Sequence, residues 1–463
     1  MNALTKNLLC VVAASTLSLS PVQSQTLYDN AIIFTMESVD VEPVTGYLLV
    51  GESGLVVEVG EGEYEGDLSL EVVDLSGKMV MPGFVSGHNH LWQSAFRGLA
   101  FDEVLYPWLE ALHWTYGKDF VDGDFYWYTL HGAVDQLSHG ITTTYNHSQR
   151  LGGTEAQYLE SLQAEIDLAQ HFVFSYNGDH RDSSKNYETL FRDFMDLAEE
   201  EMAKPETYML APSMHSVGLH TSEEALVLEM ELADEFDLVS QFHYLEQYSR
   251  RESDRSEWPI LVDADAIRPG SIFAHFIHTT DGILEESAAN GVAMIWNPLS
   301  NGRLASGLAD IPTYLETGVG VGMGVDGAAS ADIADPFENM RMGLYGLRMQ
   351  YKDAKIMSAK KIMYLHTLAT AEVIGVSDKV GSLEPGKLAD FLVLDPSNPG
   401  TGGLFDDPAA HIVGTMNSAN IESIYVAGEK QVERGQVIGQ DMQKIQAEVE
   451  DRIAALRARM DAK

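Results

Sequence analysis

The chain contains almost no cysteine. Cys10 is the only one among 463 residues, and it lies in the apolar stretch near the N-terminus. Structural disulfides and thiolate metal sites are therefore excluded from the rest of the chain. Any metal ion must be held by histidine, aspartate or glutamate.

Positive charge is also scarce. The sequence has 29 lysines and arginines against 70 aspartates and glutamates, which gives a formal net charge of −41 at pH 7. Such a surface repels nucleic acid and anionic membranes, so we expect neither as a partner. We interpret the excess of acidic residues as a soluble surface suited to a salty medium.

Long apolar runs are missing too. The apolar stretch at residues 8–20 is too short to span a bilayer, and no other segment is long and apolar enough. It follows Lys6, and it precedes Val22 and Ser24, which stand at the −3 and −1 positions of a cleavage site before Gln25. This pattern predicts a cleaved signal peptide and a secreted or periplasmic protein. An uncleaved anchor is the alternative.

Both ends of the remaining chain show β-strand patterns. Short alternating stretches punctuated by glycine fill residues 26–80, and similar stretches recur at 390–395 and 421–435. We expect these parts to pair into one small β-sandwich. Apolar residues at helical spacing then predict a C-terminal amphipathic helix, and they are Ile445, Val449, Ile453 and Leu456.

Eight apolar runs lie between these ends, and each ends in polar residues. They cover residues 79–90, 140–148, 171–180, 208–216, 238–246, 271–278, 292–301 and 319–327. Most of the connections can hold a helix, as at residues 154–170 and 222–236. Alternating strands and helices indicate a parallel sheet, and eight repeats predict an α/β fold with a (β/α)₈ TIM-type barrel.

The predicted organisation has five parts. They are a signal peptide at 1–24, the first part of the β-sandwich at 25–80, the barrel at 81–380, the second part of the sandwich at 381–440 and a terminal helix at 441–463. A barrel of this type takes about 250 residues, with insertions extending it, so the chain is long enough for this division.

Side chains suited to catalysis stand at the C-terminal ends of the runs, where barrel enzymes carry their active sites. His88 and His90 end the first run. On a strand, residues i and i+2 point to the same side, so the two imidazoles converge on one point, as a metal ion requires. Asn89 between them points the other way, and we expect it to be structural.

The motifs around these positions resemble the amidohydrolase superfamily, in particular its cytosine-deaminase-like and triazine-hydrolase-like branch. The resemblance covers nearly the whole chain after the N-terminal stretch. Its motifs are GKMVMPGFVSGHNH (77–90), FHYLEQ (242–247), AHFIH (274–278), NPLSNGRLASG (297–307), GVDGAAS (324–330) and LATAEVIGVSDKVGSLEPGKLADFLVLD (368–395).

The resemblance implies both metal ligands and catalytic groups. Glu246 would shuttle protons, and His275 would polarise the reacting centre, a role for which His278 competes. We favour His275 because it ends the apolar SIFA stretch. Asp326 would act as a base as well as a ligand, and the complete set of metal ligands would be His88, His90, His243 and Asp326.

One divalent metal is expected. The family's two-metal members bridge their ions with a modified lysine on the fourth strand, and the run at 208–216 contains no lysine. Zinc is the default for histidine and aspartate ligands, and iron is the main alternative. Such a metal makes hydroxide available from water at neutral pH.

Four residues are candidates for substrate contact: Trp92, Gln93, His215 and Asn297. The resemblance places a substrate-binding glutamine and histidine at or near Gln93 and His215, and Asn297 opens the loop motif at 297–307, which begins within the seventh run. Trp92 begins an aromatic-rich stretch at 92–128, whose rings could sandwich a flat substrate over the barrel mouth. His147 ends the second run, and it or His215 could instead support the site from behind.

The predicted function is a metal-dependent hydrolase of carbon–nitrogen bonds other than peptide bonds. The leading hypothesis is hydrolytic deamination of a small heterocycle of the purine, pterin or triazine type. The alternatives are hydrolysis of a cyclic or linear amide, or of a C–Cl bond, by the same site, and a periplasmic binding protein that has lost the chemistry. The complete ligand set together with Glu246 argues against the last of these. Assembly into a homo-oligomer is left open.

Overall fold

The computed structural model describes residues 25–66, 69–151, 153–178, 187–216, 218–220, 222–404 and 407–462. The expected signal peptide lies outside these residues. Within them, no helix combines the length and the apolar character that crossing a membrane requires.

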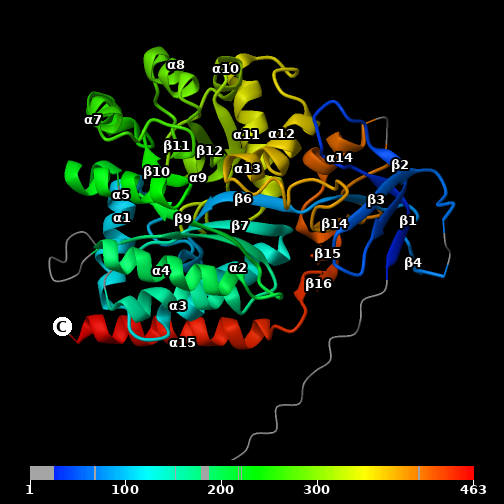
Figure 1. The fold of residues 1–463 in the computed structure, drawn as a ribbon, viewed down its shortest axis with the longest axis horizontal. Coiled ribbons are helices and arrows are strands. Elements are labelled where there is room, and N and C mark those ends of the chain that lie inside the picture. Colours follow the sequence, from blue (N-terminus) through cyan, green and yellow to red (C-terminus); the bar gives the residue numbers. More distant parts are fainter. Residues whose placement is uncertain are drawn as a thin grey trace, which may run out of the picture.

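Eight parallel strands form the barrel, and each pairs with the next in chain order (Figure 1). The strands are β6 (Phe84–Asn89), β7 (Ile141–His147), β8 (His171–Tyr176), β9 (Met209–His215), β10 (Ser240–Tyr244), β11 (Ser271–His275), β12 (Ala293–Trp296) and β13 (Gly320–Met323). The last and first strands meet where the Asp326 amide, just beyond β13, donates a hydrogen bond to the His88 carbonyl at 3.0 Å. The predicted TIM-type barrel is confirmed.

The barrel strands are covered on both faces. β8 and β11 are buried along their whole length, which explains why their sequences are nearly continuous apolar runs. The first run differs from the others because residues 79–90 divide between two sheets. β5 (Met79–Pro82) joins the sheet of the chain ends, and β6 starts the barrel after Gly83. Gly83 allows this close junction, since a Cβ there would lie 2.0 Å from Thr142 Oγ1.

Helices surround the barrel. Those along its outside are α2 (Asp124–Ser138), α3 (Glu155–Ile166), α4 (Tyr187–Met202), α5 (Glu223–Glu235), α8 (Asp281–Ala289), α10 (Ile311–Thr317), α11 (Pro336–Tyr351), α12 (Ala359–Leu365) and α13 (Leu368–Val373). Local sequence sets where they begin. Thr154, for example, forms a capping box with Gln157 at the start of α3.

Short helices follow several strands at the C-terminal end of the barrel. They are η1 (Leu91–Phe96), α1 (Leu105–Leu109), η2 (Glu110–Trp114), η3 (Gly117–Asp119), η4 (Gly218–His220), η5 (Tyr248–Arg250), α6 (Arg251–Ser256), α7 (Trp258–Asp263) and α9 (Pro298–Arg303). The segment from η1 to η3 is the aromatic-rich stretch of the sequence, and it forms one wall of the cavity described below.

The two ends of the chain share a second sheet, as expected. Its strands are β1 (Thr26–Ile33), β2 (Val44–Val50), β3 (Val56–Glu61), β4 (Glu71–Asp74), β5, β14 (Phe391–Leu394), β15 (Ile421–Val426), β16 (Glu429–Glu433) and β17 (Gln436–Val437). β5 joins the two ends, because it lies between β1 and β14. The apolar core of this second sheet includes the stacked rings of Phe391 and Tyr425, whose centroids are 4.3 Å apart. α14 (Pro408–Thr415) and η6 (Ser418–Asn420) lie between β14 and β15 in the chain.

The predicted C-terminal helix is α15 (Met442–Asp461), which lies along α2 and α3 in Figure 1. It buries Val449 and Leu456 in the same apolar cluster as Trp108. Two of its arginines also pair with Asp124 at the start of α2, Arg452 at 2.9 Å and Arg459 at 3.3 Å. The last helix therefore packs behind the aromatic wall of the barrel mouth.

Candidate active site

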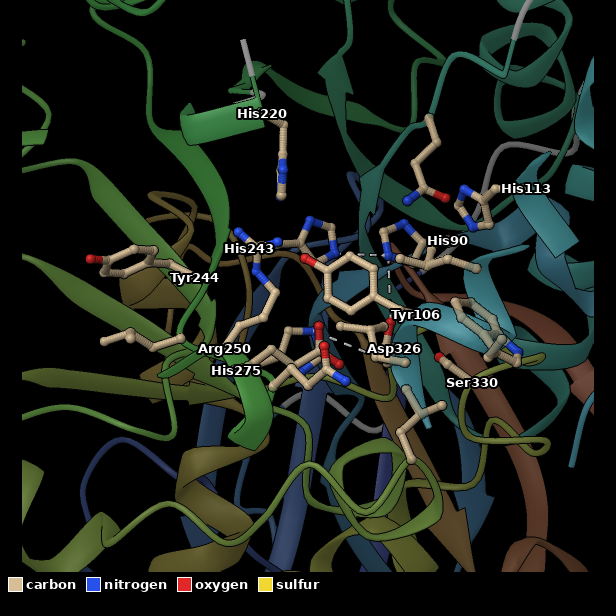
Figure 2. Close-up of a pocket in the computed structure, with 18 of the residues that line it drawn as sticks. His90, Tyr106, His113, His220, His243, Tyr244, Arg250, His275, Asp326 and Ser330 are labelled. Carbon is tan, nitrogen blue, oxygen red and sulfur yellow. Dashed lines mark hydrogen bonds and ion pairs between the residues drawn. The ribbon is translucent and has the colours of Figure 1, made fainter. Parts of the chain in front are cut away.

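Three strands bring histidines and an aspartate to one point at the barrel mouth (Figure 2). His88 lies in β6, His90 directly follows β6, His243 lies in β10, and Asp326 follows β13. The Nε2 atoms of His90 and His243 lie 3.2 Å apart. Asp326 Oδ1 lies 3.5 Å from the Nε2 atoms of both His88 and His90. The four residues predicted as metal ligands are thus brought together.

The hydrogen bonds of these histidines leave their Nε2 atoms free for a cation. His88 Nδ1 lies 2.6 Å from Gln241 Oε1, which only accepts, so Nδ1 carries the proton. His88 Nε2 is then a lone pair, and it is buried without a hydrogen-bond partner. His90 Nδ1 likewise donates to the His147 carbonyl at 2.8 Å. These outer hydrogen bonds hold the rings in the orientation that a divalent metal needs.

Burial also keeps these imidazoles neutral, which is the form that binds metal. Desolvation lowers the pKa of His88 and His243 well below the usual 6.5, and the neighbouring histidines lower it further. Desolvation also lowers the pKa of His90. The residues present therefore fit a divalent cation in both geometry and protonation.

Asp326 is the charged member of the group. Burial by itself would raise the pKa of its carboxyl, but the imidazoles of His275 and His88 outweigh that effect and lower it. The Ser300 hydroxyl and the Gly327 amide both donate to the Asp326 carboxylate. Asp326 is thus an anion with one oxygen facing the histidines.

The backbone is strained where these strands end. Leu245, His275 and Asp326 have positive φ angles of 52°, 70° and 58°. Residues other than glycine rarely adopt positive φ angles, which cost about 1–3 kcal/mol each. Such left-handed positions cluster at functional sites, and all three lie at or next to residues of the site described here.

Glu246 and His275 lie beside Asp326. His275 Nε2 is 3.8 Å from Glu246 Oε2 and 3.8 Å from Asp326 Oδ2. Asn301 Nδ2 donates to His275 Nδ1 at 2.8 Å, which leaves the proton of His275 on Nε2, facing the two carboxyls. Burial raises the pKa of Glu246 well above 4.5, and the charge of Asp326 adds to this. Burial lowers the pKa of His275 to about 4.

A cavity of about 400 Å³ opens above these residues. Of the four predicted substrate contacts, Gln93 and His215 line it. Trp92 and Asn297 are buried beside it and are not part of its lining. The cavity volume is within the range of small-molecule sites.

The cavity wall includes polar residues that the sequence analysis did not identify. Gln149 Oε1 accepts hydrogen bonds from Trp92 Nε1 at 3.2 Å and from Gln93 Nε2 at 3.3 Å. His113 Nε2 lies 3.4 Å from Gln93 Nε2, and burial lowers the pKa of His113 to about 3. Gln93 Oε1 is buried without a partner. This edge therefore offers neutral donors and acceptors and no formal charge.

Weak signals for these residues exist in the sequence. His113 lies inside the aromatic-rich stretch, and Gln149 directly follows the second apolar run. Tyr106, which also faces the cavity, has the Arg250 guanidinium 5.4 Å from its ring centre (Figure 2). Nothing in the sequence around Tyr106 or around Arg250 shows that these two residues meet.

The profile of the Amidohydrolase family matches residues 79–430. The chain belongs to the amidohydrolase family. Curated relatives of this amidohydrolase include 5-methylthioadenosine/S-adenosylhomocysteine deaminases of Bacillus cereus and Bacillus thuringiensis. Each is 28% identical over 429 residues, which cover 91% of this chain and 97% of the relative.

Solved structures share the fold of this amidohydrolase. An adenosine deaminase from Xanthomonas campestris with bound zinc has a TM-score of 0.79 at 20% identity, covering 94% of this chain and 99% of that one. Atrazine chlorohydrolase from Arthrobacter aurescens, complexed with zinc, has a TM-score of 0.80 at 22% identity, covering 92% of this chain and 100% of that one. At 20% and 22% identity, the similarity of these structures to this chain shows a shared fold.

Proposed function

We propose that this amidohydrolase removes an amino group from a nitrogen heterocycle by hydrolysis, with one bound zinc ion. The proposal rests on two features that lie side by side in one cavity. One group is the set of neutral histidines and ionised Asp326 that fits a cation. The other is the buried acid Glu246, which lies 3.8 Å from His275.

The residues divide the work of such a reaction. The cation, when bound, supplies the Lewis acidity that makes water nucleophilic at neutral pH. Asp326, which stays ionised, accepts a proton from the attacking water. Glu246, whose pKa is raised, holds a proton at its carboxyl and delivers it to the ring nitrogen or the departing amine. His275 donates from Nε2 to the developing negative charge.

The relatives and the cavity wall both favour a purine-type substrate. The Bacillus relatives are deaminases of 5-methylthioadenosine and S-adenosylhomocysteine by name. The neutral edge formed by Gln93, His113 and Gln149 suits the donor and acceptor atoms of an uncharged heterocycle. The zinc-containing solved structures support zinc as the cation.

An ammonia-release screen of the purified zinc-loaded protein tests the proposal. The panel holds free purines, purine nucleosides, pterins, triazines and cyclic amides, and Glu246→Gln is the matched control for contaminating deaminases. Ammonia release from at least one heterocycle, absent in the variant, supports the proposal. Opening of cyclic amides without ammonia release would replace it with the amidase alternative.

The cation itself is tested by elemental analysis. We expect about one tightly bound divalent metal per chain, because the run at residues 208–216 contains no lysine that could bridge a second ion. The double variant His88→Ala/His243→Ala should lose it. Full metal content in that variant would contradict the ligand assignment.

We also propose that the protein is exported and that the mature chain begins at Gln25. The support is the signal-peptide pattern in the first 24 residues of the sequence. N-terminal sequencing of protein from the native host should show that these residues are absent. An intact Met1 in the cytoplasmic fraction would contradict export.

A further inference from the structure

The side-chain amide of Gln149, on the cavity wall, has a fixed orientation. Trp92 Nε1 lies 3.2 Å from Gln149 Oε1, and an indole nitrogen can only donate, so the atom that it meets must be the amide oxygen. Gln93 Nε2 donates to the same oxygen at 3.3 Å. A rotation of the Gln149 amide by 180° would set N–H groups against N–H groups, so the orientation is determined by the partners.

The nitrogen of the same amide has no protein partner. Gln149 is partly buried and lines the cavity, and its Nε2 makes no hydrogen bond with any residue that the structure describes. This nitrogen is also not one of the fully buried side-chain atoms that lack a partner, so it reaches the open space of the cavity. Its N–H groups can therefore be satisfied only by water or by a ligand.

The backbone on both sides of Gln149 is anchored. The Ser148 carbonyl accepts a hydrogen bond from His215 Nδ1 at 2.6 Å, and the Arg150 amide donates to Asn177 Oδ1 at 3.0 Å. His215 ends β9, and Asn177 directly follows β8. A donor held in this way loses little conformational freedom when a ligand binds, so the contact that it makes is specific as well as favourable.

The amide of Gln149 also stands apart from the groups that carry out the chemistry. Glu246 and His275 lie beside Asp326. Figure 2 shows His113, which belongs to the same edge of the cavity as Gln149, on the other side of Asp326 from His275. A flat ring bound between these two sides presents one edge to Glu246 and His275 and a different edge to Gln149.

We propose that Gln149 determines specificity, because its amide N–H donates to an unprotonated ring nitrogen of the substrate on an edge other than the reacting one. This inference deepens the proposed function and rests on it. A C–H group in place of that nitrogen would leave the Gln149 donor unpaired, and an N–H group would oppose it. Purine-type rings fit, because they carry further acceptor nitrogens besides the one next to the amino group.

Calorimetric titration of the zinc-loaded Glu246→Gln protein tests the contact without turnover. The probes are adenosine, 3-deazaadenosine and 7-deazaadenosine, and each deaza compound has C–H in place of one ring nitrogen. At least one of them should bind about tenfold more weakly than adenosine. Adding Gln149→Met should weaken the binding of adenosine by a similar factor and should abolish the preference for it, as expected when the two changes remove the same interaction.

Steady-state kinetics of the single variant distinguishes this contact from structural damage. Gln149→Met should raise KM for adenosine with little change in kcat, because the hydrogen bond is present in both the ground state and the transition state. Damage to the site would lower kcat and would affect the three compounds alike. Gln443→Met, the same change at an exposed position on α15, is the control and should keep the wild-type preference.

Gln149→Glu is a second variant. It keeps an oxygen that can accept from Trp92 and Gln93 but presents no donor when ionised, so it should also lose the preference for adenosine. It decides the question if Gln149→Met does not fold, as judged by circular dichroism.

Three results would overturn the role of Gln149. They are equal binding of the three compounds to the Glu246→Gln protein, binding of none of them, and a preference that survives the replacement of Gln149. Ammonia release from adenosine that does not depend on Gln149 would leave the proposed function standing and refute this inference. Binding that requires both the ring nitrogen and Gln149, without ammonia release from any heterocycle, would do the opposite.

Discussion

At the scale of single residues, two buried carboxyls in one cavity are tuned in opposite directions. Burial and the charge of Asp326 raise the pKa of Glu246, whereas the neighbouring imidazoles hold the pKa of Asp326 below its usual value. Pairs of titratable groups whose pKa values are pushed apart are typical of sites that need both a proton donor and a proton acceptor. Glu246 is the group whose proton the proposed reaction consumes.

Replacing Glu246 with glutamine tests that role. Glutamine keeps the shape of the side chain but cannot carry a proton, so kcat should fall by about 10²–10⁴-fold, with little change in KM. The metal content should stay unchanged, because Glu246 belongs to none of the ligand groups. Steady-state kinetics on a substrate from the ammonia screen, with elemental analysis, measures both.

The matched control is Glu257→Gln, which makes the same chemical change elsewhere on the cavity lining. It should leave kcat within a few-fold of wild type. A Glu246→Gln enzyme with a near wild-type rate would show that another group carries the proton.

The sequence predicted some of these residues well and others not at all. The spacing of His88 and His90 encodes their common direction, because side chains on a strand alternate. His243, Glu246, His275 and Asp326 lie at or near the C-terminal ends of apolar runs, and the resemblance to the amidohydrolase superfamily assigned their roles. His113 and Gln149 could not, because their meeting with Gln93 depends on how the segment from η1 to η3 folds over the barrel mouth. Tertiary packing of an irregular segment leaves no periodic signal in the sequence.

At the scale of elements, the structure confirms the predicted strands. They could be predicted because each is a buried apolar run that ends in polar residues. The boundary at Gly83 was not predicted, since residues 79–90 are apolar on both sides of it and only the pairing of β5 with β1 and β14 assigns it to the other sheet. Helix α3 contains a buried carboxyl group that the helical pattern of the sequence did not predict. Glu165, near its end, is buried against the barrel and accepts a hydrogen bond from Asn146 Nδ2 at 2.7 Å.

Glu165 should make stability depend on pH. Burial raises the pKa of its carboxyl well above 4.5, so over the window between 4.5 and that raised value the folded state holds a proton that the unfolded state has released. The free energy of unfolding therefore falls as pH rises through this window, by up to about 1.4 kcal/mol per pH unit. Glu165→Gln removes this contribution, so its stability relative to wild type should increase with pH.

Urea unfolding between about pH 5 and pH 8 measures the difference. Glu199→Gln on α4 is the control, because that side chain is exposed, and it should show no such trend. A constant difference between Glu165→Gln and wild type across this range would mean that the carboxyl does not retain its proton in the folded state.

Helix α15 should support the cavity wall from behind. Leu456 is fully buried in a cluster that also contains Trp108 and Leu304, and both of these line the cavity. Leu456→Ala should lower the free energy of unfolding by about 2–5 kcal/mol, because it leaves a void in that cluster. KM should rise as well, since the wall loses part of its support. Arg457→Ala, an exposed neighbour on the same helix, should change neither quantity appreciably.

At the scale of the whole molecule, charge and fold set different properties. The barrel and the shared end sheet follow from apolar patterning, which is why the fold could be predicted from the runs alone. The net charge of −41 had no part in that prediction, because net charge governs self-repulsion, solubility and partners and does not select a fold. It should nevertheless affect how stable the folded state is.

A compact chain with this charge repels itself, and dissolved salt screens the repulsion. The Debye length shortens from about 30 Å at 0.01 M to about 3 Å at 1 M, so most of the screening is complete within that range. We therefore expect Tm to rise by several degrees as sodium chloride increases from about 0.02 M to about 0.5 M, and then to level off. Differential scanning calorimetry of the zinc-loaded protein measures the change. Sucrose at matched osmolality is the control, since an uncharged osmolyte strengthens burial without screening charge. A Tm that is flat or falls with chloride would show that the acidic residues are spaced widely enough, or paired well enough, for their repulsion not to matter.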